Sequence, residues 1–75
     1  MNSDKTLDAK GLNCPLPILK AKKALKDMTP GQVLEIFSTD AGSIADFAAF
    51  CRTTGNELLE SNTGGDVYTY YIKKT

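Results

Sequence analysis

The sequence contains no histidine, and it has only two cysteines among its 75 residues. Without histidine, neither a Ser-His-Asp triad nor a Cys-His pair can form. Two cysteines alone also cannot complete the usual four-ligand zinc site. Most self-contained hydrolases and resident metal sites are thereby excluded, and we expect the protein to work without a cofactor.

Net charge is also lacking, since nine basic residues balance nine acidic ones. A zero balance argues against a broad nucleic-acid surface, and we expect no direct contact with DNA. The polar start leads into no long apolar run, which predicts a cytoplasmic protein without a signal peptide or membrane contact. In a reducing compartment, cysteines are reactive or buried rather than disulfide-bonded. The length fits one domain over residues 1–75.

Hydrophobic periodicity divides the chain into six elements in the order βαβαββ. Strands are expected over residues 6–9, 32–38, 57–62 and 67–74, and helices over residues 15–28 and 43–54. Right-handed crossovers place both helices on the same face of the sheet. The open face should then carry Val33, Phe37 and Tyr71, a patch that could dock another protein or a second copy.

Each predicted helix carries an apolar stripe. The stripes are Ile18, Ala21, Leu25 and Met28 in the first helix, and Ile44, Phe47, Ala48 and Cys51 in the second. Ser43 is expected as the N-cap of the second helix, with Asp46 in its first turn and Gly55 as its C-terminal cap. Cys51 is predicted to be a core residue, the alternatives being a resolving thiol or a second sulfur acceptor.

The segment from Leu7 to Pro17 organises the chain, because it places Cys14 between a glycine-containing turn and two prolines. Pro15 and Pro17 predict a helix start, since proline lacks an N–H that would be unpaired in a first turn. We expect them to rigidify this start without being needed for packing. The helix dipole favours a thiolate there and lowers its pKa from roughly 8.5 to about 7 or below. Cys14 is predicted to be a nucleophile or sulfur handle, the alternative being an incidental small residue.

Five lysines and no acidic residue lie in the segment from Lys10 to Lys26. They are Lys10, Lys20, Lys22, Lys23 and Lys26. Such a run is usually a solvated helix face. The functional interpretation is a basic rim beside Cys14 that lowers its thiol pKa and attracts an acidic partner or RNA. Asp8 could also tune this site, although at the end of a strand it is more typical of a turn residue or a lysine partner.

With this motif and element order, the sequence resembles the TusA/SirA-like sulfur carrier family. The match to its Gly-Leu-x-Cys-Pro-x-Pro signature rests on Gly11, Leu12, Cys14, Pro15 and Pro17. The resemblance covers almost the whole chain and implies an α+β fold, a two-layer α/β sandwich with a four-stranded mixed sheet. It also implies that Cys14 is a persulfide acceptor and that Gly11, Pro15 and Pro17 shape the site.

The resemblance further implies a sulfur donor protein, either a cysteine desulfurase or a rhodanese, and a sulfur acceptor protein. Family members act in tRNA thiolation, molybdenum cofactor assembly or sulfur oxidation. Three positions depart from the tRNA-thiolation members: Asn13 replaces a basic residue, Leu16 an acidic one and Asn56 a histidine. Residues beside the cysteine are those a docking partner reads, so these differences bear on partner identity rather than on carrier chemistry.

The residues expected to tune the thiolate or contact a partner are Asp8, Lys10, Asn13, Leu16, Lys20, Lys22 and Lys23. The resulting prediction is a persulfide carrier of the sulfurtransferase type, acting with partner enzymes as a monomer or weak dimer. The main alternative is a non-catalytic regulatory module that binds RNA or an acidic protein through the segment Lys10–Lys26. A thiol redox protein is a further alternative, but the sequence has no nearby resolving cysteine.

Overall fold

The structure, a computed structural model, describes residues 3–13 and 15–75. Its elements are β1 (Lys5–Ala9), α1 (Leu16–Lys26), β2 (Val33–Ser38), α2 (Ser43–Thr54), β3 (Glu57–Asn62) and β4 (Tyr68–Lys73). The predicted order βαβαββ is confirmed, and the predicted ends lie within two residues of these bounds.

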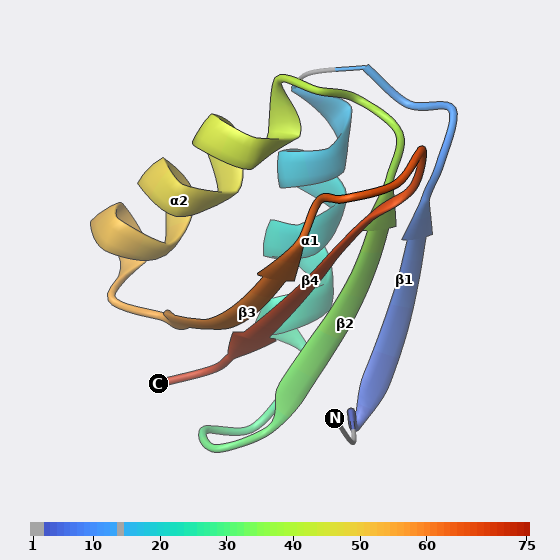
Figure 1. Cartoon of the computed structure of the whole chain (residues 1–75). Helices are drawn as coiled ribbons and strands as arrows, with labels where there is room; N and C mark the ends of the chain where they lie inside the picture. Colours follow the sequence, from blue (N-terminus) through green and yellow to red (C-terminus); the bar gives the residue numbers. More distant parts are fainter. Residues whose placement is uncertain (1–2, 14) are drawn as a thin grey trace.

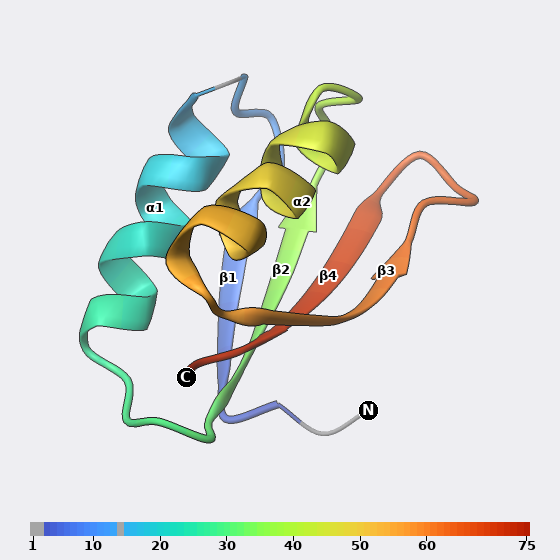
Figure 2. The same cartoon turned by 90° about the vertical axis from the view of Figure 1, so that its left-hand side faces the viewer.

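The four strands form one mixed sheet in the order β1-β2-β4-β3. β1 runs parallel to β2, whereas β4 is antiparallel to both of its neighbours. A parallel pair requires a crossover connection, which α1 provides between β1 and β2. Both helices cover the same face of the sheet, as the two views show (Figures 1 and 2). The expected two-layer α+β sandwich is therefore confirmed.

Alternation along β2 and β4 separates the two faces of the sheet. The helix-covered side chains are Leu34, Ile36, Ser38, Tyr70 and Ile72, and all of them are fully buried. Val33, Phe37 and Tyr71 alternate with these and are partly exposed, as predicted for the open face. On that face the Glu35 carboxylate accepts hydrogen bonds from Tyr71 (2.6 Å) and Thr6 (3.2 Å), which link three strands. The hydrogen bond to Glu35 raises the pKa of Tyr71.

The buried face of α2 agrees with the sequence-based prediction at Phe47 and Cys51 but differs from it elsewhere. Gly42 is the N-cap, and Ser43 is instead the first helical residue. Its hydroxyl is fully buried and lies 2.8 Å from the Tyr70 hydroxyl. A serine that turns inward to satisfy this tyrosine directs Ser43, Phe47 and Cys51 to the core. Ile44 and Ala48 are consequently exposed, so their placement in the apolar stripe was wrong.

The start of α1 agrees with its two prolines. Pro15 is the N-cap without a side-chain hydrogen bond, and Pro17 lies in the first turn. Pro17 is also fully buried, so the expectation that the prolines are not needed for packing was wrong for Pro17, whereas Pro15 is exposed. The Pro17 ring begins an apolar face that continues through Ala21 and Leu25.

Among the described residues, neither helix is long and apolar enough to cross a membrane.

Lys74 binds backbone carbonyls at the C-terminal end of α1. Its Nζ donates to the carbonyl oxygens of Leu25 and Met28, each at 2.6 Å. The last carbonyls of a helix have no partner within the helix, and a cation there also complements the helix dipole. We expect Lys74→Met to lower the free energy of unfolding by about 1–2 kcal/mol. Urea denaturation would measure this, and Lys73→Met, at an exposed neighbouring position, is the matched control. Equal effects of the two substitutions would contradict the assigned role.

Candidate functional site

The candidate site lies where β1 and β2 end. The parallel register pairs Ala9 with Ser38, so the connections that follow these strands leave the same edge of the sheet. One connection leads to α1 and the other to α2, and both helices begin at the upper edge in Figure 1. Thr39, the first residue after β2, accepts a hydrogen bond from the Gly11 N–H at 2.9 Å. Two helix N-termini and the segment leading to Cys14 are thereby gathered at one edge.

Cys14 itself lies outside the described residues, but the residues directly before and after it are described. Pro15 directly follows it and is the N-cap of α1. The Asn13 carbonyl accepts a hydrogen bond from the Leu16 N–H at 2.9 Å, which connects the loop before Cys14 to the first residue of α1. Asn13, Pro15 and Leu16 are all exposed. The predicted helix start next to the cysteine is therefore confirmed, while the activation of the thiol stays a prediction.

Local hydrogen bonds shape the loop before the cysteine. The Asp8 carboxylate accepts the Lys10 N–H at 3.0 Å, and the Ala9 carbonyl accepts the Leu12 N–H at 3.3 Å. Gly11 follows with a φ of +80°, the left-handed region that favours glycine. Asp8 thus acts as the turn residue that the sequence indicated. Its influence on the cysteine stays a prediction.

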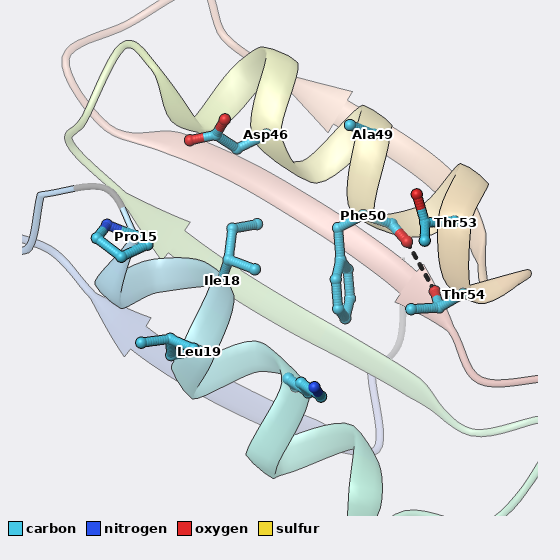
Figure 3. A pocket seen from close by; sticks show the side chains of 9 residues that line it. Pro15, Ile18, Leu19, Asp46, Ala49, Phe50, Thr53 and Thr54 are labelled. Atoms are coloured by element: carbon cyan, nitrogen blue, oxygen red, sulfur yellow. Dashed lines mark hydrogen bonds between the residues drawn. The ribbon is translucent and has the colours of Figure 1, made fainter.

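A groove of about 470 Å³ runs between α1 and α2, beginning at Pro15 (Figure 3). Its lining is mostly apolar and consists of Pro15, Ile18, Leu19, Lys22, Asp46, Ala49, Phe50, Thr53 and Thr54. Ile18 and Phe50 point into the space between the helices, and Leu19 is 54% exposed. This groove was not predicted from the sequence. An apolar residue at Leu19, outside the predicted stripe, was the available signal.

The lysines of the segment Lys10–Lys26 are all exposed but do not share one surface. Lys22 lines the groove between the helices. Lys20 and Lys23 instead line a smaller hollow of about 190 Å³ against β1, together with Lys5. Lys10 lies 6.0 Å from the centre of the Phe37 ring, on the open face of the sheet. Successive residues of a helix are rotated by 100°, so lysines that are close in sequence point to different sides of α1. The contribution of these lysines to a site stays a prediction.

Cys51 is a core residue, as predicted. Its side chain is only 5% exposed. Burial raises the pKa of this thiol to about 11. The protonated form therefore dominates at neutral pH, and a protonated thiol is a poor nucleophile. This environment favours the structural role over a resolving thiol or a second sulfur acceptor.

The raised pKa of Cys51 makes stability depend on pH in the alkaline range. Between its ordinary value of 9.0 and about 11, the unfolded chain binds fewer protons at this thiol than the folded chain. The free energy of unfolding must therefore fall as the pH rises through this range. We expect the advantage of the wild type over Cys51→Ala to shrink by about 2 kcal/mol between pH 8 and 11. Urea denaturation under reductant measures both proteins, and parallel pH profiles would contradict this.

Comparisons with known proteins agree with the fold and with the family that the sequence resembles. A model of the family described as "Sulfurtransferase TusA" matches residues 5–74. The chain is 57% identical to the sulfur carrier protein TusA of Allochromatium vinosum, over 96% of this chain and 95% of that protein. It is 46% identical to the putative sulfur carrier protein YrkI of Bacillus subtilis, over 99% of each chain. The crystal structure of a SirA-like protein from Desulfitobacterium hafniense superposes with a TM-score of 0.81 at 27% identity, covering 92% of this chain and 95% of that one.

Proposed function

This chain belongs to the sulfurtransferase TusA family, and on that basis we propose that it is a sulfur carrier that accepts sulfane sulfur on Cys14. The sulfur is held as a persulfide and relayed from a donor protein to an acceptor protein. The observation that supports the proposal is that Pro15, the residue that follows Cys14 in the sequence, is the N-cap of α1. The backbone N–H groups and dipole of that end stabilise an anionic sulfur.

The transfer requires no general base. The Cys14 thiolate attacks the outer sulfur of a donor persulfide, R–S–SH, and a new S–S bond forms to Cys14. The old S–S bond breaks, and its electron pair leaves with the donor as the thiolate R–S⁻. The transferred sulfur keeps its proton, so the step is an exchange without net oxidation. A chain without histidine can therefore perform this exchange.

The groove between α1 and α2 supports the proposal because a carrier must dock on each partner. It begins at Pro15, the residue after Cys14, and presents a mostly apolar lining. The loop of a donor that carries a persulfide would lie over this groove and meet Asn13 and Leu16, the residues on either side of Cys14 and Pro15 in the sequence. Leu16 is 46% exposed, as suits a contact residue rather than a core residue.

Intact-protein mass spectrometry without reductant tests the proposal. The protein is incubated with a cysteine desulfurase and cysteine, and separately with a rhodanese and thiosulfate. We expect a gain of one sulfur atom, removable by reductant, and peptide mapping should place it on Cys14. The effective donor indicates whether tRNA thiolation, cofactor assembly or sulfur oxidation is the pathway to pursue. Failure to gain sulfur from any donor, with Cys14 alkylating no faster than a small thiol, would contradict the carrier role.

A further inference from the structure

The loop that leads into Cys14 is tied by a hydrogen bond to a distant part of the chain. Residues 10–13 are held mainly by local hydrogen bonds, from Lys10 to Asp8 and from Leu12 to Ala9. The hydrogen bond from the Gly11 N–H to the Thr39 Oγ1 ties this loop to a residue 28 positions away, and the Leu12 side chain packs against the core. The hydrogen-bond length of 2.9 Å is ideal for such a bond.

Among the described residues, the structural role that the Thr39 side chain fulfils is this hydrogen bond. Its side chain is exposed and belongs to neither the core nor the groove. It directly follows Ser38, which is fully buried in β2 and pairs with Ala9. The hydroxyl therefore projects from the end of β2, next to a buried and paired residue. We propose that Thr39 is a positioning residue for sulfur transfer, whose hydroxyl holds the Gly11 loop so that the chain enters Cys14 in a fixed geometry.

The anchor matters because the chain on the near side of Cys14 contains a glycine in the left-handed region. On the far side, Pro17 is fully buried and helix α1 begins at once. On the near side, Gly11 has no neighbour within 4 Å of where a Cβ would lie, and glycine has the largest conformational freedom of any residue. The Thr39 hydroxyl restricts this freedom before a donor arrives. Pre-organisation of this kind accelerates a reaction without any contact to the reacting atoms.

This inference rests on the proposed function, and the donor enzyme that loads the wild type provides its test. Thr39→Val keeps the shape of the side chain but removes the hydroxyl, whereas Thr39→Ser keeps the hydroxyl. For Thr39→Val we expect kcat for sulfur loading to fall roughly 3- to 10-fold, the range typical of one lost hydrogen bond. KM for the carrier should stay within about twofold, because the docking groove is unchanged. Thr39→Ser should load at nearly the wild-type rate.

A second measurement follows the loop itself and does not depend on sulfur loading. Amide hydrogen exchange at Gly11 should be faster in Thr39→Val than in the wild type, and Thr39→Ser should restore the slow rate. Wild-type kcat in Thr39→Val, or an equal loss in both variants, would overturn the positioning role. A rise in KM with unchanged kcat would do the same, since it would place Thr39 in docking. If the wild type itself gains no sulfur, the proposed function fails, and unchanged Gly11 exchange in Thr39→Val would still overturn the anchor.

Discussion

The Cys14→Ser variant is expected to lose sulfur loading from every donor, by at least about a thousandfold. A serine hydroxyl is not ionised at neutral pH and cannot form the S–S bond on which the transfer depends. The substitution exchanges a single atom, so the chain should still fold, as circular dichroism and thermal unfolding can verify. Loading is measured by intact mass after a fixed time and, for rates, by the loss of donor persulfide.

The second cysteine supplies the matched control. Cys51→Ala removes a thiol that is buried and whose pKa is raised to about 11, so it should load at nearly the wild-type rate despite some loss of stability. The pair of variants thereby separates the two thiols of the chain. Sulfur found on Cys14→Ser but absent from Cys51→Ala would move the acceptor to Cys51 and contradict the proposed mechanism.

Most of the fold follows from local patterns in the sequence. Strict alternation in β2 and β4 indicates which side chains face the helices, because neighbouring residues on a strand point to opposite faces. The α2 face was harder to predict. Ser43 is a favoured N-cap residue by type, and only the tertiary contact with Tyr70 reveals that its hydroxyl turns inward instead. Pro17 was misjudged for the same reason, since burial depends on what packs against it.

The candidate site likewise has features that could be predicted from the sequence and features that could not. The signature around Cys14 and the helix start at Pro15 are continuous in sequence and could be predicted. The contact between Gly11 and Thr39 joins residues 28 positions apart, and no periodicity indicates it. The groove likewise requires two helices to lie side by side, with Ile18 on one and Phe50 on the other (Figure 3). Features assembled from separate elements depend on the arrangement in space.

The second large effect on sulfur loading is expected from a substitution of Leu19, which lines this groove. We expect Leu19→Asp to slow loading by a protein donor at least about tenfold, as the loss of an apolar anchor at an interface typically does. A carboxylate would also have to be desolvated against the donor surface. Leu19 is 54% exposed in the free protein, so the substitution should cost little stability. Initial rates at several carrier concentrations should show the loss mainly as a higher KM.

Two controls test whether the slower loading of Leu19→Asp reflects weaker docking: loading by polysulfide and the variant Val67→Asp. Polysulfide is small enough to react without docking, so it should load Leu19→Asp at nearly the wild-type rate. Val67→Asp introduces the same charge at a position that is 41% exposed and outside the groove, and it should leave both reactions unchanged. Slower polysulfide loading of Leu19→Asp would show that the new charge suppresses the Cys14 thiolate itself. Equal slowing of both variants by the protein donor would show that donors respond to overall charge, and the groove would then not be the docking surface.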